Sequence, residues 1–229
     1  VEIVQAHLDE GYRRVKLKVK PGFDVEPVGR VRAHVGPDVA LQVDANAAYR
    51  ADDPDHQAAL RGLDEFGLVL IEQPFPEEQV RAHAELATRS STPICLDESV
   101  LDVTTTNDAL DAGACSIVNI KPGRVGGLLS AVSIHELCRA RGVPVWCGGM
   151  LETGIGRAGL LALASLPGFT LPGDISASER YWHRDLVTAP FTVDGDGRMA
   201  VPDGPGLGVE VDLDFLESVT DSVETVTVP

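Results

Sequence analysis

Residues 68–74 read LVLIEQP, four apolar residues followed by the carboxylate of Glu72. A strand that is covered on both faces of a parallel sheet is almost wholly apolar, so a charge near its end is unusual. Short runs of this kind, each with a polar residue near its end, recur every 24 to 28 residues. Seven runs are expected to be strands: RRVKLKV (13–19), VALQVDAN (39–46), LVLIEQP (68–74), TPICLDES (92–99), CSIVNIKPG (115–123), VPVWCGG (143–149) and FTLPGD (169–174).

The segments between these runs have the apolar periodicity of helices, and several of them end at Gly or Pro. Repeated βα units form either a doubly wound sheet or a closed (β/α)8 barrel. The sequence has seven expected strands and opens on a helical pattern over residues 1–12. The simplest interpretation is an α/β fold, a TIM barrel whose first strand lies upstream of Val1.

The alternation of apolar runs and helical patterns stops after Pro190. Residues 191–202, FTVDGDGRMAVP, are typical of a hairpin around residues 195–197, and the last residues are typical of a loosely held tail. We therefore expect a barrel domain over residues 1–190. Residues 191–229 are expected to be a C-terminal hairpin and tail that pack on the barrel or on a domain outside this sequence.

Charged residues stand at or near the ends of five consecutive runs. In chain order they are Lys16 with Lys18, Asp44, Glu72, Asp97 with Glu98, and Lys121. Buried charge is costly unless it is paired or bound to a metal. In a parallel barrel the carboxyl ends of the strands converge on one face, where active sites are built. The sequence therefore predicts one pocket in which three carboxylates lie between lysines.

The carboxylates of Asp44, Glu72 and Asp97 would repel one another unless a cation lay among them. Ligands that are all oxygen select a hard ion, Mg²⁺ or Mn²⁺, and these strand ends carry no His or Cys that would favour zinc. Each carboxylate alone is more often a helix cap or a surface ion pair. One acidic strand end in each of three consecutive units favours the metal site over that alternative.

Lys18 lies one strand before the acids and Lys121 one strand after them. In a closed barrel their ammonium groups would lie on opposite sides of the metal. A lysine that is desolvated near a cation has a lowered pKa and can act as a base. Removal of a proton next to a carboxylate gives an enediolate, whose charge a divalent ion stabilises. The pattern predicts proton abstraction α to a carboxylate.

Six motifs carry a family resemblance: VKLKVKPG, VDANAAY, IEQPF, LDES, NIKPGRVGG and CGGMLETGIGRA. Together, over about residues 11–182, they resemble the muconate-lactonizing subgroup of the enolase superfamily, and most closely its o-succinylbenzoate synthases and N-succinylamino acid racemases. The resemblance implies a modified enolase barrel preceded by an N-terminal capping domain. We expect this sequence to be the excised barrel, without that domain and without the first strand.

The resemblance also implies roles for individual residues. Lys18 and Lys121 are similar to acid–base lysines on the two faces of the substrate. The positions similar to metal ligands are Asp44, Glu72 and Asp97. The positions expected to support the metal and the lysines are Lys16, Asn46 and Glu98. The positions expected to let the substrate approach the backbone are Gly148, Gly149 and Met150.

The activity that the resemblance implies is that of o-succinylbenzoate synthase, a Mg²⁺-dependent carbon–oxygen lyase of the menaquinone pathway. One alternative is an N-succinylamino acid (N-acylamino acid) racemase that uses Lys18 and Lys121 on opposite faces. Muconate cycloisomerase and dipeptide epimerase activities are weaker alternatives, and a non-catalytic metal-binding barrel is one of another class. Because the same residues serve synthase and racemase, the sequence does not separate these two reactions.

The amino-acid composition limits the classes of molecule that the protein is expected to bind. The chain has 35 acidic and 19 basic residues and a net charge of -16. Such a surface repels phosphate backbones and anionic lipid, so neither nucleic acid nor a membrane is an expected partner. The four cysteines have no metal-site or disulfide spacing, which is typical of a reduced, cytoplasmic protein. We expect a small carboxylate substrate and a homo-oligomer.

Overall fold

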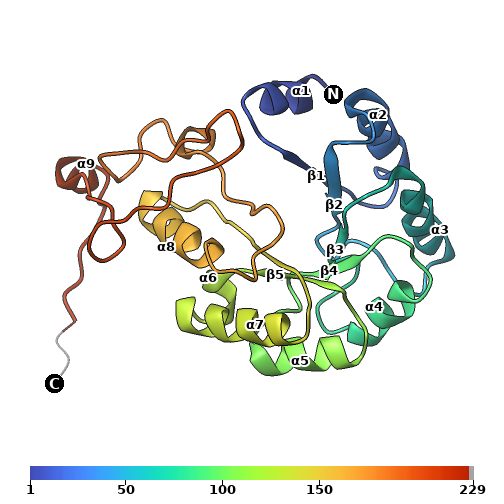
Figure 1. Cartoon of the computed structure of the whole chain (residues 1–229). Coiled ribbons are helices and arrows are strands. Elements are labelled where there is room, and N and C mark those ends of the chain that lie inside the picture. The colour runs from blue at the N-terminus through green and yellow to red at the C-terminus, as the bar shows by residue number, and fades with distance from the viewer. Residues whose placement is uncertain (227–229) are drawn as a thin grey trace.

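The computed structural model describes residues 1–226 and contains a six-stranded parallel sheet. The strands pair in the order in which they occur along the chain, and they follow an arc with helices on its outer side (Figure 1). The architecture is a partial (β/α)8 barrel, which confirms the predicted α/β fold class. The strands are β1 (Arg14–Lys18), β2 (Ala40–Asp44), β3 (Ile71–Glu72), β4 (Ile94–Leu96), β5 (Ile117–Ile120) and β6 (Val145–Cys147).

Capping residues set the bounds of several helices. The side chain of Asp24 accepts a hydrogen bond from the backbone of α2 (Val25–Val35), and Asp102 forms a capping box with Thr105 at the start of α5 (Val103–Asp111). The remaining helices are α1 (Glu2–Asp9), α3 (Pro54–Gly62), α4 (Val80–Ala87), α6 (Pro122–Val125), α7 (Leu128–Ala140), α8 (Gly154–Ala164) and α9 (Leu213–Ser218), with 3-10 turns η1 (Leu63–Phe66) and η2 (Ser178–Arg180).

Side chains alternate between the two faces of each strand. One set packs outward in two apolar clusters, one around β1–β3 with α2 and α3 and the other around β4–β6 with α5 and α7. The other set faces the concave side, where four buried residues form a small apolar floor. They are Leu70, Cys95, Ile117 and Trp146. The charged strand ends belong to the inward set, one layer above this floor.

The seventh expected strand is not a regular strand. Residues 169–174 run beside β6, with a parallel bridge between Val145 and Phe169 and a hydrogen bond from the Asp174 N–H to the Cys147 carbonyl at 2.8 Å. The Leu171 N–H donates to the Val145 carbonyl at 3.4 Å, and the next bond to β6 comes three residues later, at Asp174, so the regular two-residue spacing of a parallel ladder is lost. The prediction of seven strands is therefore corrected to six strands and one extended segment.

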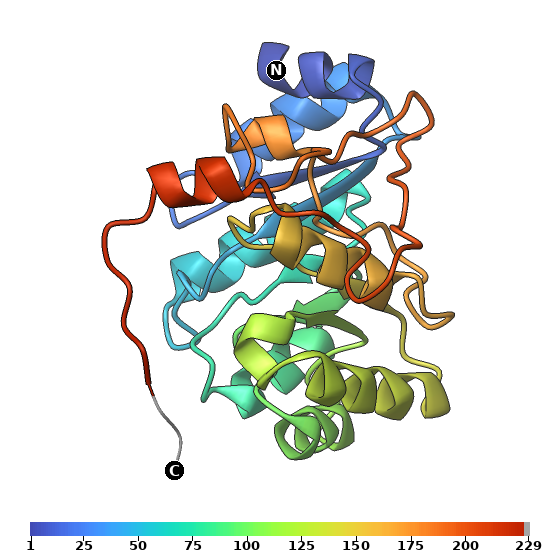
Figure 2. The ribbon, with the colours of Figure 1, turned by 90° about the vertical axis from the view of Figure 1, so that its left-hand side faces the viewer.

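The C-terminal segment combines a tight turn with a short helix. The Asp194 N–H donates to the Arg198 carbonyl at 2.9 Å, and the described residues on either side of this turn form no strand. Phe191 packs against Ala158 and Leu161 of α8. Figure 2 shows the chain after α9 leading away from the body of the molecule. The division at residue 190 remains a prediction, and residues 227–229 of the expected tail lie outside the described part.

None of the helices within residues 1–226 is both long enough and apolar enough to cross a bilayer.

Candidate active site on the concave face of the sheet

The charged strand ends lie together at one edge of the sheet. Lys18, Asp44 and Glu72 are the last residues of β1, β2 and β3, and the register pairs Lys18 with Asp44 and Asp44 with Glu72. Asp97 and Lys121 directly follow β4 and β5. The structure thus brings together the five residues that the sequence placed at strand ends, while their chemical roles remain predictions.

Each of the two outer carboxylates is held by one of the two lysines. Lys18 Nζ donates to Oδ2 of Asp44 at 2.6 Å, and Lys121 Nζ donates to Oδ2 of Asp97 at 2.7 Å. Both carboxylates are at most 1% exposed, so these ion pairs offset much of the cost of burying them. The two ammonium groups therefore stand at the two sides of the site.

The central carboxylate, Glu72, is fully buried, and only one of its two oxygens accepts a hydrogen bond. Its Oε1 accepts from Asn119 Nδ2 at 2.9 Å, but Oε2 lies 3.7 Å from Lys16 Nζ and has no hydrogen-bond partner in the described chain. Burial raises the pKa of Glu72 to about 8; the charges of Asp44 and Asp97 act in the same direction, and Lys16 opposes them. A cation beside Oε2 would relieve both penalties.

The residues fit a hard cation by donor type. Within residues 1–226, no three His, Cys, Asp or Glu side chains already stand in a metal-holding arrangement. The oxygens of Asp44 and Asp97 accept hydrogen bonds from lysine and arginine side chains instead. Arg124 donates to the Asp97 backbone carbonyl at 2.6 Å and also to Oδ1 of the Asp97 side chain. Three carboxylates with one unsatisfied buried oxygen are nevertheless the donor set that Mg²⁺ prefers. Asp44, Glu72 and Asp97 are the side chains that would hold such an ion.

Asp174 is a site residue to which the sequence analysis gave no role. It accepts a hydrogen bond from Lys16 Nζ and lies 4.0 Å from Arg14 Nη2. Burial opposes ionisation of Asp174, but Lys16, Arg14 and Lys121 outweigh it and hold the pKa of Asp174 below its usual range. Its position was visible in the sequence, because it ends the seventh apolar run as the other acids end theirs.

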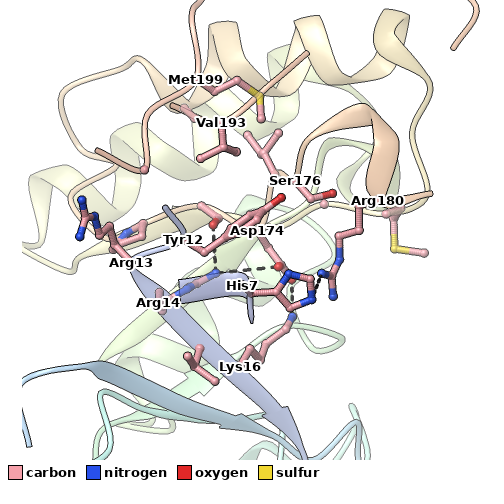
Figure 3. A pocket seen from close by; sticks show the side chains of 18 of the residues that line it. His7, Tyr12, Arg13, Arg14, Lys16, Asp174, Ser176, Arg180, Val193 and Met199 are labelled. Atoms are coloured by element: carbon pink, nitrogen blue, oxygen red, sulfur yellow. Dashed lines mark hydrogen bonds and ion pairs between the residues drawn. The ribbon is translucent and has the colours of Figure 1, made fainter. Parts of the chain in front are cut away.

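Lys16 lies among the acids, with Nζ 3.6 Å from Asp44 and 3.7 Å from Glu72. Burial alone would lower its pKa, but the charges of Glu72, Asp174 and Asp44 outweigh burial and raise the pKa above its ordinary value. Figure 3 shows Lys16 and Arg14 reaching from β1 toward Asp174. The raised pKa favours the charged form of Lys16, and its role as an electrostatic neighbour of Lys18 remains a prediction.

Arg14 and Trp146 form the layer beneath. The guanidinium carbon lies 4.5 Å from the centre of the Trp146 ring, and Nη1 donates to Gln42 Oε1 at 2.9 Å. This stacking places a second buried cation below the acids. Neither Arg14 nor Gln42 was singled out from the sequence, since both lie inside a strand and away from its end.

Asn46 links Lys18 to Glu98. Its Oδ1 accepts from Lys18 Nζ at 2.6 Å, and its Nδ2 donates to Glu98 Oε1 at 3.0 Å. The backbone N–H of Asn46 also donates to Asp44 Oδ1 at 3.0 Å. Asn46 and Glu98 thus support the Lys18 side of the site, whereas Arg124 supports the Lys121 side through Asp97.

Gly148 and Gly149 leave room for the site. A Cβ atom on Gly148 would lie 2.6 Å from Cε and 2.7 Å from Cγ of Lys121, and one on Gly149 would meet the Asp174 carbonyl. Met150, which follows them, is 63% exposed at the rim. The glycines therefore let the Lys121 side chain and the segment at Asp174 approach the end of β6, and substrate contact by these three residues remains a prediction.

The space at Gly148 can be tested with an alanine. We expect Gly148→Ala to lower the free energy of unfolding by about 1–3 kcal/mol, because the added methyl group displaces Lys121 or its neighbours. The matched control is Gly123→Ala in α6, where an added Cβ meets nothing within 4 Å. Urea unfolding of both variants measures the effect, and equal stabilities would show that the site near Gly148 is not tightly packed.

An open cavity of about 900 Å³ adjoins these residues. Lys18, Lys121 and Gly149 line the part at the strand ends, and α1 and residues 193–201 contribute to its other side. Figure 3 shows Val193 and Met199 on that apolar side, across from the charged residues. A cavity of this size, with cations at one wall, has room for a small organic anion.

Comparison with known sequences gives a family and two kinds of relative. The sequence model of the enolase C-terminal domain-like family matches residues 1–215. The chain is 57% identical over 220 residues to an N-succinylamino acid racemase from an Amycolatopsis species, which covers 96% of this chain and 58% of that protein. It is 50% identical over 220 residues to an o-succinylbenzoate synthase from Geobacillus stearothermophilus, covering 96% of this chain and 57% of the relative.

Comparison with solved structures gives the same superfamily. A solved enolase-superfamily protein from Listeria innocua superposes with a TM-score of 0.91 at 43% sequence identity, over 96% of this chain and 58% of that one. The chain thus spans less than two thirds of the length of the relatives that it matches.

Proposed function

The chain belongs to the enolase C-terminal domain-like family, and on this premise we propose that its strand-end site removes a proton α to a carboxylate with the help of Mg²⁺. The observation that carries the proposal is the pair of lysines. Lys18 and Lys121 engage buried carboxylates on either side of Glu72, so two proton-transfer groups flank one candidate metal position. Enolase-superfamily sites pair a Lys or His base with one or two Mg²⁺ ions.

Asp44, Glu72 and Asp97 would hold the ion. Bound Mg²⁺ would stabilise the negative charge that develops on the substrate carboxylate as the proton leaves. Other residues of the chain would support the site. Lys16 places a positive charge beside the acids, and Asn46 Oδ1 accepts a hydrogen bond from Lys18 Nζ at 2.6 Å. Mn²⁺ satisfies the same donor chemistry.

The first candidate reaction is the syn-dehydration of an o-succinylbenzoate synthase. Lys18 would take the α-proton and return it to the departing hydroxyl, so that water leaves and a carbon–carbon double bond forms. Lys121 would stay protonated on the other face and stabilise the carboxylate charge. The 50% identity to a synthase supports this reaction.

The second candidate is an N-succinylamino acid racemase. One lysine would remove the α-proton, and the other would deliver a proton to the opposite face. A racemase requires an acid–base group on each face, and Lys18 and Lys121 satisfy that requirement on the two sides of the site. The relative with 57% identity, which is named as such a racemase, supports this reaction.

Two assays on the whole protein with Mg²⁺ separate the candidates. Exchange of the α-proton of an N-succinyl amino acid in D₂O is followed by proton NMR, and dehydration of the cyclohexadiene precursor is followed by absorbance. We expect dehydration, with α-exchange as the second activity. If neither reaction occurs, both substrate assignments are wrong, while the metal site could still stand. A non-catalytic barrel would bind Mg²⁺ and show neither reaction.

Two further expectations belong with this proposal. A cytoplasmic location is supported by the composition and by the metabolic enzymes that the chain resembles, and self-association of the whole protein remains an expectation. Neither is needed for the chemistry derived above.

A further inference from the structure

Gln73 directly follows Glu72 at the end of β3 and is fully buried. A buried amide is costly unless its donors and acceptors are paired. Its side chain is fully paired: Oε1 accepts from the Asp97 N–H at 2.9 Å and the Ser99 N–H at 3.2 Å. Nε2 donates to the Phe75 carbonyl at 3.0 Å and to Ser99 Oγ at 2.8 Å. Gln73 therefore uses two donors and two acceptor positions within the ends of β3 and β4.

The backbone of Gln73 extends this network to a third strand. Its N–H donates to the Cys95 carbonyl of β4 at 2.9 Å, and its carbonyl accepts from the Ala47 N–H, just past β2, at 2.8 Å. The Glu72 carbonyl accepts from the Ala45 N–H at 2.9 Å. The turns that carry Asp44, Glu72 and Asp97 are thus fastened together at this one position.

The backbone near the candidate metal carboxylates also has an uncommon conformation. Three residues other than glycine have a positive φ in the described chain: Asn46 at 41°, Ala47 at 60° and Gln73 at 39°. All three lie within three residues of a candidate metal carboxylate. Such conformations are uncommon for residues with a side chain and persist where the surroundings impose them. Two of the three, Ala47 and Gln73, are joined directly by the bond from the Ala47 N–H to the Gln73 carbonyl.

We propose that Gln73 is a positioning residue that sets the spacing of the three carboxylates for the metal. The inference rests on the proposed function, since it concerns the Mg²⁺ site. The polar atoms of the buried Gln73 side chain are all paired within the protein. Gln73 holds the Asp97 backbone through Oε1 and the turn after Asp44 through its backbone carbonyl. Without the amide, the end of β4 loses the bond that fixes Asp97 relative to Glu72.

The test measures Mg²⁺ affinity of the whole protein by isothermal titration calorimetry, without any turnover. Gln73→Met keeps the length of the side chain but neither donates nor accepts in this way. We expect it to raise the Mg²⁺ dissociation constant by about 10- to 100-fold, the usual effect of removing a residue that supports metal ligands. If Gln73→Met does not fold, Gln73→Asn takes its place. Asparagine tolerates a positive φ, but its shorter side chain does not reach the Asp97 N–H.

Two controls separate positioning from general stability. Ser99→Ala removes one partner of Gln73 but leaves the bond to Asp97, so its dissociation constant is expected to stay within threefold of the wild type. Ile134 of α7 is fully buried in the outer apolar cluster and is not a hydrogen-bond partner of Gln73. Ile134→Ala is therefore expected to lower the melting temperature without removing a bond of the network. It is expected to bind Mg²⁺ as the wild type does.

The outcomes are distinct. A dissociation constant for the Gln73 variant within threefold of the wild type would overturn the positioning role while the proposed function stands. An equal loss of affinity in Ile134→Ala would also overturn it, because instability alone would then explain the effect. A wild-type protein that binds no Mg²⁺ would instead refute the metal site of the proposed function.

Discussion

In the whole protein, Lys18→Ala and Lys121→Ala are each expected to lower turnover by about 10²- to 10⁴-fold, the range for loss of a positioned acid–base group. Neither change should unfold the protein. Asp44 keeps Lys16 Nζ at 3.6 Å when Lys18 is removed, and Asp97 keeps Arg124 when Lys121 is removed. The loss should therefore appear in catalysis and not in the melting temperature.

The two variants also report which face of the substrate each lysine serves. If the lysines work on opposite faces, each single variant should exchange the α-proton of one enantiomer of an N-succinyl amino acid and leave the other unexchanged. Proton NMR in D₂O with each pure enantiomer measures this. Lys20→Ala is the matched control, because Lys20 is exposed on the loop after β1. Turnover that survives both site changes would show that the two lysines do not carry the reaction.

The positions of the acids could be read from the sequence because strand length and strand period are local properties. An apolar run ends where a polar residue appears, and parallel strands bring such ends to one edge. Lys18, Asp44 and Glu72 lie where this rule puts them. The same rule reached Asp174, but it gave no reason to connect that residue with Lys16, 158 positions earlier in the chain.

The remaining features depend on contacts between strands, which one sequence does not reveal. Arg14 and Trp146 stack although 132 positions separate them, and neither stands at the polar end of a run. The role of Gln73 follows from its bond to the Asp97 N–H and from a positive φ, and neither leaves a mark on composition or periodicity. The seventh run was expected to be a strand because its apolar pattern resembles the others, but its hydrogen bonds to β6 lack the regular two-residue spacing of a strand.

Glu72→Gln should separate the requirements of metal binding from those of folding. The change keeps the shape of the side chain and its bond to Asn119 but removes the negative charge. We expect Mg²⁺ affinity, measured by titration calorimetry, to fall at least about 100-fold, because affinity for hard cations depends on the number of charged oxygen ligands. Glu85→Gln on α4, a half-exposed position away from the site, should leave the affinity unchanged.

In EDTA the same variant should be more stable than the wild type. Burial raises the pKa of Glu72 to about 8, so folding at neutral pH requires this carboxyl to take up a proton, and a neutral glutamine does not bear that cost. Lys16 loses little, since it keeps its bond to Asp174 and its place 3.6 Å from Asp44. Urea unfolding in EDTA should therefore show a higher midpoint for Glu72→Gln, and Mg²⁺ should stabilise only the wild type. A lower midpoint would mean that attraction to Lys16 outweighs burial, and equal Mg²⁺ affinity would remove Glu72 from the ligand set.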